Sequence, residues 1–153
     1  MNDFFSSMYE FGGLLPFYGT DLGDHLRGFD VTCSGYVGTP WYTYVGCMML
    51  ALTAFAYLIQ YHLIDSPRYN GKGSWWMTIA VLCALNFVLA FTIALNSVHS
   101  GDVCKQLHIT GGDLAGFGLA SALWAFLWYV LLTSFPWIRR ASTNCKYTTF
   151  WKP

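Results

Sequence analysis

Three long runs of apolar residues constrain this chain more than any other feature. They cover residues 41–64, 75–97 and 114–138, and none of them contains Asp, Glu, Lys or Arg. A bilayer core about 30 Å thick needs roughly 20 mainly apolar residues in a helix, because a helix closes its backbone hydrogen bonds within the segment. We therefore predict an all-α integral membrane protein with three transmembrane helices.

The composition agrees with a lipid surrounding. Charged residues make up 10% of the 153 residues and hydrophobic residues 55%, whereas soluble domains carry about 25% charged residues. This is too few charged residues to give the folded chain a water-exposed surface. We therefore expect the lipid bilayer to be its first partner. The formal net charge of zero gives no reason to expect nucleic acid.

The N-terminal segment, residues 1–40, is apolar in places, but a glycine pair and Pro16 divide it into pieces too short to cross a membrane. It lacks the basic leader of a secretory signal, so we expect it to remain in the mature protein. Its many aromatic residues predict an ordered exterior segment rather than a disordered tail. Five apolar residues fall on one side of a helix, which could lie in the membrane interface or pack against the spans: Phe4, Phe5, Met8, Phe11 and Leu15.

Charge predicts the orientation of the three spans. The N-terminal segment and the loop after the second span share one side, with two basic and seven acidic residues, a net charge of minus five. The loop at 65–74 and the tail at 139–153 share the other side, with six basic residues and one acidic residue, a net charge of plus five. Basic residues in short loops stay in the cytoplasm, so we predict the N-terminus outside, the C-terminus inside and a cytoplasmic tail. So sharp an asymmetry is typical of a bacterial inner membrane protein.

Aromatic and basic residues mark the ends of the predicted spans. Trp and Tyr side chains prefer the membrane interface, and arginines after a span act as its stop and anchor. The residues that we expect to anchor the chain in this way are Trp41, Trp75, Trp76, Trp137, Arg139 and Arg140.

The five cysteines divide by their predicted location. Cys47 and Cys83 lie within spans, and Cys145 lies in the tail, where a thiol should stay reduced. Cys33 and Cys104 fall in two loops on the same outer side, so they can pair in an oxidising compartment. We predict a Cys33–Cys104 disulfide, with two unpaired loop cysteines as the alternative.

No residue pattern names a reaction. His99, Asp102, Cys104 and His108 share one outer loop, but their spacing matches no closed zinc site, and a solvated loop is the simpler interpretation. Phosphate-binding glycine loops, zinc-protease motifs and nucleophile elbows do not occur. We therefore expect neither an enzyme nor a bound metal or cofactor.

Small residues repeat every four positions in the second and third spans. Such residues let two helices approach closely, within one chain or between subunits, and a polar residue in a span usually makes an interhelical hydrogen bond. The candidate packing residues are Gly118, Ala122, Ala125, Ala80, Ala84 and Asn86.

These features together favour a subunit or anchor over a catalyst. The first hypothesis is a non-enzymatic membrane subunit of a larger assembly, such as a secretion, injection or envelope complex, with other membrane subunits or further copies of the chain as partners. The second is a homo-oligomeric pore, although only Thr78, Asn86 and Thr92 supply a partial polar stripe. An immunity protein against a membrane-acting toxin also fits the three-span plan.

Overall fold

The structure, a computed structural model, describes residues 2–10, 17–30, 32–63, 72–100, 103–104 and 106–134. Its regular elements are all helical, and these ranges contain no strand. Two short helices, α1 (Asn2–Glu10) and α2 (Thr20–Arg27), precede three long ones. The long helices are α3 (Trp41–Leu58), α4 (Lys72–His99) and α5 (Gly111–Ser134), and α3 continues into a π-helical turn, η2 (Ile59–Leu63).

Within the described residues, three long helices match the three predicted spans. Trp41–Tyr61, Gly73–His99 and Gly111–Ser134 are each long and apolar enough to cross a membrane. The second and third helices each begin three residues earlier than predicted, at Lys72 and Gly111, because polar residues before each apolar run continue the helix. Residues 135–138 of the third predicted span lie outside the described residues, as does the tail.

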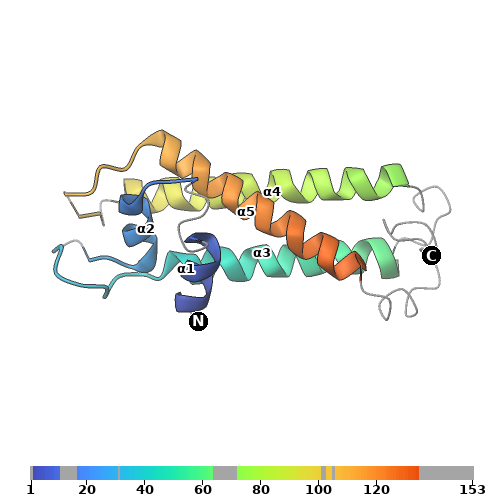
Figure 1. The fold of residues 1–153 in the computed structure, drawn as a ribbon, viewed down its shortest axis with the longest axis horizontal. Coiled ribbons are helices and arrows are strands. Elements are labelled where there is room, and N and C mark those ends of the chain that lie inside the picture. The colour runs from blue at the N-terminus through green and yellow to red at the C-terminus, as the bar shows by residue number, and fades with distance from the viewer. Residues whose placement is uncertain are drawn as a thin grey trace.

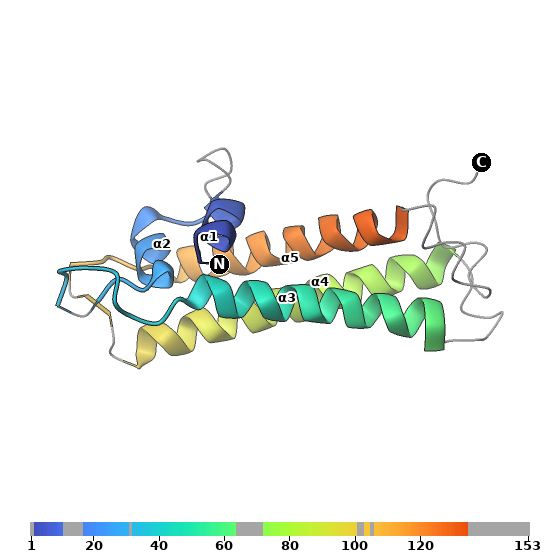
Figure 2. The same cartoon turned by 90° about the horizontal axis from the view of Figure 1, so that it is seen from below.

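The long helices form a bundle with a cap at one end. In Figure 1, α3 and α4 run antiparallel along the molecule and α5 crosses them diagonally. Seen from below, α1 and α2 lie on the same side as α5, near the end where α3 begins (Figure 2). We call α1, α2 and the loop from Gly28 to Pro40 the cap. The cap therefore gathers on one end of the bundle.

The helices α4 and α5 approach closely through small residues. A Cβ atom on Gly118 of α5 would lie 2.9 Å from the Phe87 ring of α4, so only glycine fits without a shift of that ring. Ala90 and Ala94 of α4 and Ala125 of α5 are fully buried. Close approach of this kind is the usual way in which membrane helices gain packing energy.

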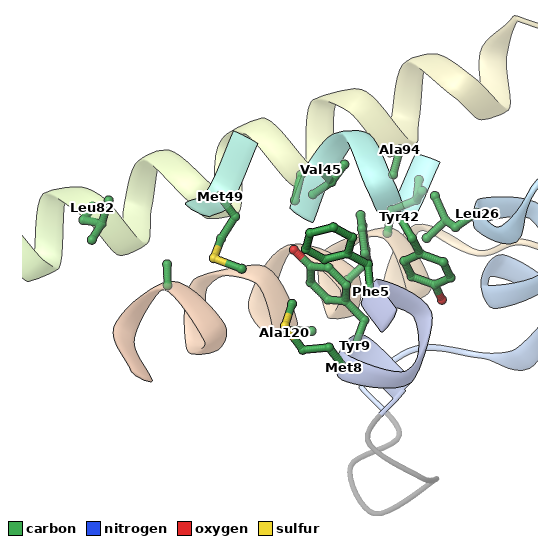
Figure 3. Packing of buried hydrophobic residues seen from close by; sticks show 14 of the residues in the cluster. Phe5, Met8, Tyr9, Leu26, Tyr42, Val45, Met49, Leu82, Ala94 and Ala120 are labelled. Carbon is green, nitrogen blue, oxygen red and sulfur yellow. The ribbon is translucent and has the colours of Figure 1, made fainter. Parts of the chain in front are cut away.

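Aromatic rings fill the core beneath the cap. The ring centroids of Tyr9 in α1 and Phe117 in α5 lie 5.2 Å apart, and Tyr42 in α3 lies within 6 Å of both. Figure 3 shows Phe5, Tyr9 and Tyr42 gathered between the three helices. Each aromatic pair adds about 0.5–1.5 kcal/mol beyond the burial of its area, so α1 is a packed part of the bundle.

Candidate functional site

The first helix docks against the sides of α3 and α5. The Phe5 ring lies over Gly46 of α3, where a Cβ atom would stand 2.2 Å from the ring. The hydroxyl groups of Tyr9 and Ser121, on α1 and α5, lie 3.4 Å apart. Burial raises the pKa of Tyr9 to about 12, so its phenol stays neutral at physiological pH. Glycine at position 46 is therefore what lets α1 approach so closely.

A polar network joins α1, α2 and α3. Arg27 Nε donates to Glu10 Oε1 over 3.0 Å, and Arg27 Nη2 bonds Glu10 Oε2, so the pair is bidentate. Tyr42 donates to Glu10 Oε1 over 3.2 Å, which uses its one hydroxyl proton, so Tyr18 donates to Tyr42 across 2.9 Å. Burial lowers the pKa of Arg27, but the hydrogen bond to Glu10 and the charge interactions with Glu10, Tyr42 and Asp24 together outweigh it, so the pKa is raised overall.

We expect Glu10→Ala to lower the free energy of unfolding by about 1–2 kcal/mol, because it removes the acceptor of Arg27 and Tyr42. Glu10→Gln keeps an acceptor oxygen and should lose less. Chemical unfolding in detergent measures the change, and Asp3→Asn, an exposed carboxylate in the same helix, is the matched control. Equal stability of Glu10→Ala and Asp3→Asn would contradict the role given to Glu10.

Further hydrogen bonds tie the cap to α4 and to the start of α5. His25 Nε2 lies 3.1 Å from the hydroxyl of Ser97 near the end of α4, and both side chains are buried. Gly19 N donates to Asp113 Oδ1 over 2.7 Å, and His108 N donates to Asp21 Oδ2 over 3.0 Å. The cap is thus held to every helix of the bundle.

A disulfide fastens the loop of the cap. The structure joins Cys33 to Cys104 with their Cα atoms 5.5 Å apart, which links the loop before α3 to the loop before α5. The predicted pair is therefore present. Cys47 is exposed and Cys83 half-buried, both as free thiols, and Cys145 lies outside the described residues.

The described surface has two hollows of interest. One is a cavity of about 190 Å³ beside the cap, lined by residues of α2 and the cap loop, by Trp41 at the start of α3 and by Ser100 directly after α4. The other is an apolar groove of about 360 Å³ between α3 and α4 near their other ends, lined by exposed Phe55, Met77 and Val81 and by buried Gln60. We call them the cap cavity and the lateral groove.

One interhelical hydrogen bond lies beside the lateral groove. The hydroxyl of Tyr129 in α5 donates to Gln60 Oε1 in η2, and both side chains are almost fully buried. The sequence reasoning missed this pair, although a glutamine near the end of an apolar span was a signal for it. The bond holds η2 against α5, and its acceptor Gln60 is one of the residues that line the groove.

Tyr129→Phe should therefore lower the free energy of unfolding by about 0.6–1.7 kcal/mol, from the average to the largest value measured for interhelical hydrogen bonds in a membrane protein. Tyr44→Phe removes the same hydroxyl from an exposed position and should leave stability unchanged. Unfolding of both variants in mixed micelles, followed by circular dichroism, compares them. A loss no larger in Tyr129→Phe than in Tyr44→Phe would show that the bond to Gln60 adds nothing.

Most other polar side chains within the long helices bond to their own backbone. Asn86 Nδ2 donates to Leu82 O over 2.9 Å, and the hydroxyls of Thr53, Thr78 and Thr92 each donate to the carbonyl four residues earlier. The predicted interhelical bond of Asn86 therefore stays a prediction. These bonds lower the free-energy cost of placing the polar groups in an apolar surrounding. They do not link the polar side chains into one polar path.

The predicted packing residues fall into two groups. Gly118 and Ala125 face α4 and the core, and the Cys83 thiol donates to Ala122 O across 3.5 Å. Ala80 and Ala84 lie exposed on α4. Only the first group meets a neighbouring helix within the described chain, so packing by Ala80 and Ala84 stays a prediction.

The predicted membrane anchors also differ among themselves. Trp76 is half exposed, whereas Trp75 is buried and its ring centroid lies 6.0 Å from that of Tyr129. Trp41 is half-buried and lines the cap cavity. Three of the anchors lie outside the described residues: Trp137, Arg139 and Arg140.

Among the described residues, no group of three His, Cys, Asp or Glu side chains gathers closely enough to hold a metal ion. His99 Nδ1 lies 2.9 Å from Leu95 O of its own helix. Comparison of the chain with protein-family models, with curated proteins and with solved structures found no match. Function therefore has to be inferred from the geometry alone.

Proposed function

We propose that this chain is a non-enzymatic membrane subunit, or anchor, of a larger membrane-embedded assembly, and that it contacts its partners through the cap. The loop tip at Tyr36 and Val37 carries this proposal. Val37 is 87% exposed and Tyr36 56% exposed, although the loop is fastened by the Cys33–Cys104 disulfide. Exposed apolar patches mark contact surfaces, and we infer that this ordered tip is part of one.

The position of the tip separates it from other exposed apolar residues. Phe55, Met77 and Val81 lie on long helices, where lipid can cover them. The cap loop, which carries the tip, extends beyond the start of α3 at one end of the bundle (Figure 1), so we do not expect lipid tails to cover the tip. Tyr36 donates to Asp24 Oδ1 over 3.0 Å, which fixes the aromatic ring of the tip relative to α2.

The proposal includes an orientation and a membrane. The net charges of minus five and plus five on the two predicted sides support an outside cap and a cytoplasmic tail under the positive-inside rule. The same asymmetry supports a bacterial inner membrane. In this orientation the disulfide faces the oxidising side, where it can form and persist.

A homo-oligomeric pore has less support. Its candidate polar stripe consists of Thr78, Asn86 and Thr92, but Asn86 is buried and Thr92 exposed, so the three do not share a face. Each also bonds to its own helix. A pore needs polar groups that line one common path, which this arrangement does not supply.

The test is the composition of the native particle. The chain is expressed from its own locus, extracted in mild detergent and weighed by native mass spectrometry. We expect foreign subunits to co-purify, and Val37→Asp to lose them while Thr20→Asp, an exposed position in α2, keeps them. A homo-oligomer alone would turn attention to the pore, and a bare monomer would overturn the proposal.

A further inference from the structure

The cap cavity has a lining that suits a positively charged ligand. Its volume is about 190 Å³, and its side-chain lining is His25, Phe29, Asp30, Thr39, Trp41 and Ser100. It thus combines one carboxylate and one imidazole with two aromatic rings and two hydroxyl groups. No lysine or arginine is among the described residues that line it.

The backbone around the cavity adds to this preference. Gly28 N and Phe29 N donate to His25 O and Asp24 O at the C-terminal end of α2, and Gly28 lines the cavity. The C-terminal end of a helix carries partial negative charge, which attracts cations. The partial negative charge of this helix end and the Asp30 carboxylate therefore both favour a cation.

The wall of the cavity is built closely from backbone. Gly28 has a φ of 98°, and a Cβ atom on it would lie 2.6 Å from Gly38 O, so the position requires glycine. Gly38 N in turn donates to Gly28 O over 2.8 Å. His25, which lines the cavity, is only 4% exposed, and its contact with the Ser97 hydroxyl holds its ring in place. The cavity is thus a formed site rather than a gap between loose loops.

We propose that the cap cavity binds an ammonium group. The Asp30 carboxylate, which also accepts a hydrogen bond from Thr32 Oγ1 over 2.6 Å, supplies the opposite charge, and the aromatic residues Phe29 and Trp41, of a kind that attracts cations, line the same cavity. The volume is below the range of drug-sized ligands, so the occupant is small. Trp41 is the first residue of a helix long enough to cross a membrane, so the ammonium comes either from a free amine or from a lipid headgroup.

The first experiment tests the charge directly on the full chain in detergent. Isothermal titration calorimetry compares choline with 3,3-dimethylbutan-1-ol, which has the same shape but no charge, and ethanolamine is the third probe. We expect choline or ethanolamine to bind at least tenfold more tightly than the alcohol. If neither choline nor ethanolamine binds more tightly than the alcohol, the proposal is overturned, whatever any variant does.

The second experiment locates the site. Asp30→Asn should weaken binding at least tenfold and Trp41→Leu several-fold, whereas Asp3→Asn, an exposed carboxylate of α1, should change it less than twofold. Formation of the Cys33–Cys104 disulfide in each variant reports whether the cap still folds. An Asp30→Asn variant that folds and binds as the native chain does would overturn the assignment.

The third experiment separates the two sources of the ammonium. The chain is placed in nanodiscs of phosphatidylglycerol with or without phosphatidylethanolamine, and native mass spectrometry counts the lipids that it retains. Retention of phosphatidylethanolamine by the native chain but not by Asp30→Asn supports a headgroup, and binding of the soluble amines alone supports a free ligand. Failure of the amines and of the lipid to bind would overturn the proposal.

Discussion

Gly116→Ala in α5 should release the chain around Phe17 and Tyr18 from the bundle and lower the free energy of unfolding by about 1–3 kcal/mol. A Cβ atom on Gly116 would stand 1.6 Å from Phe17 O and 2.6 Å from Phe17 C. Both are backbone atoms, so no side-chain rotation can relieve the clash. The segment that leads into α2 must therefore move away from α5.

A matched substitution in the same helix separates this clash from helix propensity. Alanine is favoured over glycine inside a helix by about 1 kcal/mol, so Gly116→Ala must overcome a gain before it shows a loss. Gly111→Ala meets no atom within 4 Å and should be neutral or slightly stabilising. Thermal unfolding in detergent gives the stabilities, and limited proteolysis near Phe17 reports the release. If the two variants unfold alike, the segment does not rest on α5.

The three spans could be predicted because their signal is local. Each is an uninterrupted apolar run, and the length that a bilayer demands leaves few alternatives. The helix bounds were less accurate at the start of α4, where Lys72 and Gly73 belong to the helix although they precede the apolar run. Polar residues and glycines before an apolar run carry little information about where the first turn of the helix begins.

The way that the cap docks could not be predicted, because its contacts join residues far apart in sequence. Gly19 bonds Asp113, 94 positions away, and Tyr9 lies against Ser121, 112 positions away. The apolar stripe of α1 is compatible with a membrane surface or with a neighbouring helix. Of the predicted stripe, Phe5 and Met8 are buried against the bundle, Phe4 is exposed, and Phe11 and Leu15 lie outside the described residues. The close approach of α1 to α3 depends on Gly46, which no local pattern singles out.

The disulfide could be predicted because the number of spans alone shows that the two cysteines lie at the same end of the bundle. Cys33 precedes the first long helix and Cys104 follows the second, so both lie at the same end of the bundle whichever way it is oriented. The helix-packing residues were harder to predict, because their spacing shows which face of a helix they share but not which helix packs against that face. Gly118 and Ala122 are four positions apart, and so are Ala80 and Ala84. Yet Gly118 contacts Phe87, whereas Ala84 lies exposed.

Loss of the Cys33–Cys104 disulfide should produce the largest change in stability of any single alteration considered. The bond closes a loop with a sequence separation of 71, for which the chain-entropy relation gives about 4 kcal/mol. The double variant Cys33→Ser with Cys104→Ser should approach this loss in a denaturant that unfolds the spans. A smaller loss is expected in mild detergent, because the spans then keep the ends of the loop close together.

The two single variants sharpen this test. Cys33→Ser and Cys104→Ser should each remove the mobility shift between reduced and oxidised protein, and each should lose as much stability as the double variant, because one bond is lost in every case. Cys47→Ser, which alters an exposed free thiol, should keep both the shift and the stability. Modification of Cys33 and Cys104 by a maleimide in the native, unreduced protein would contradict the bond. Since Cys33 lies in the loop that carries Tyr36 and Val37, its loss should also weaken the association with partner subunits that we propose, whereas Cys47→Ser should not.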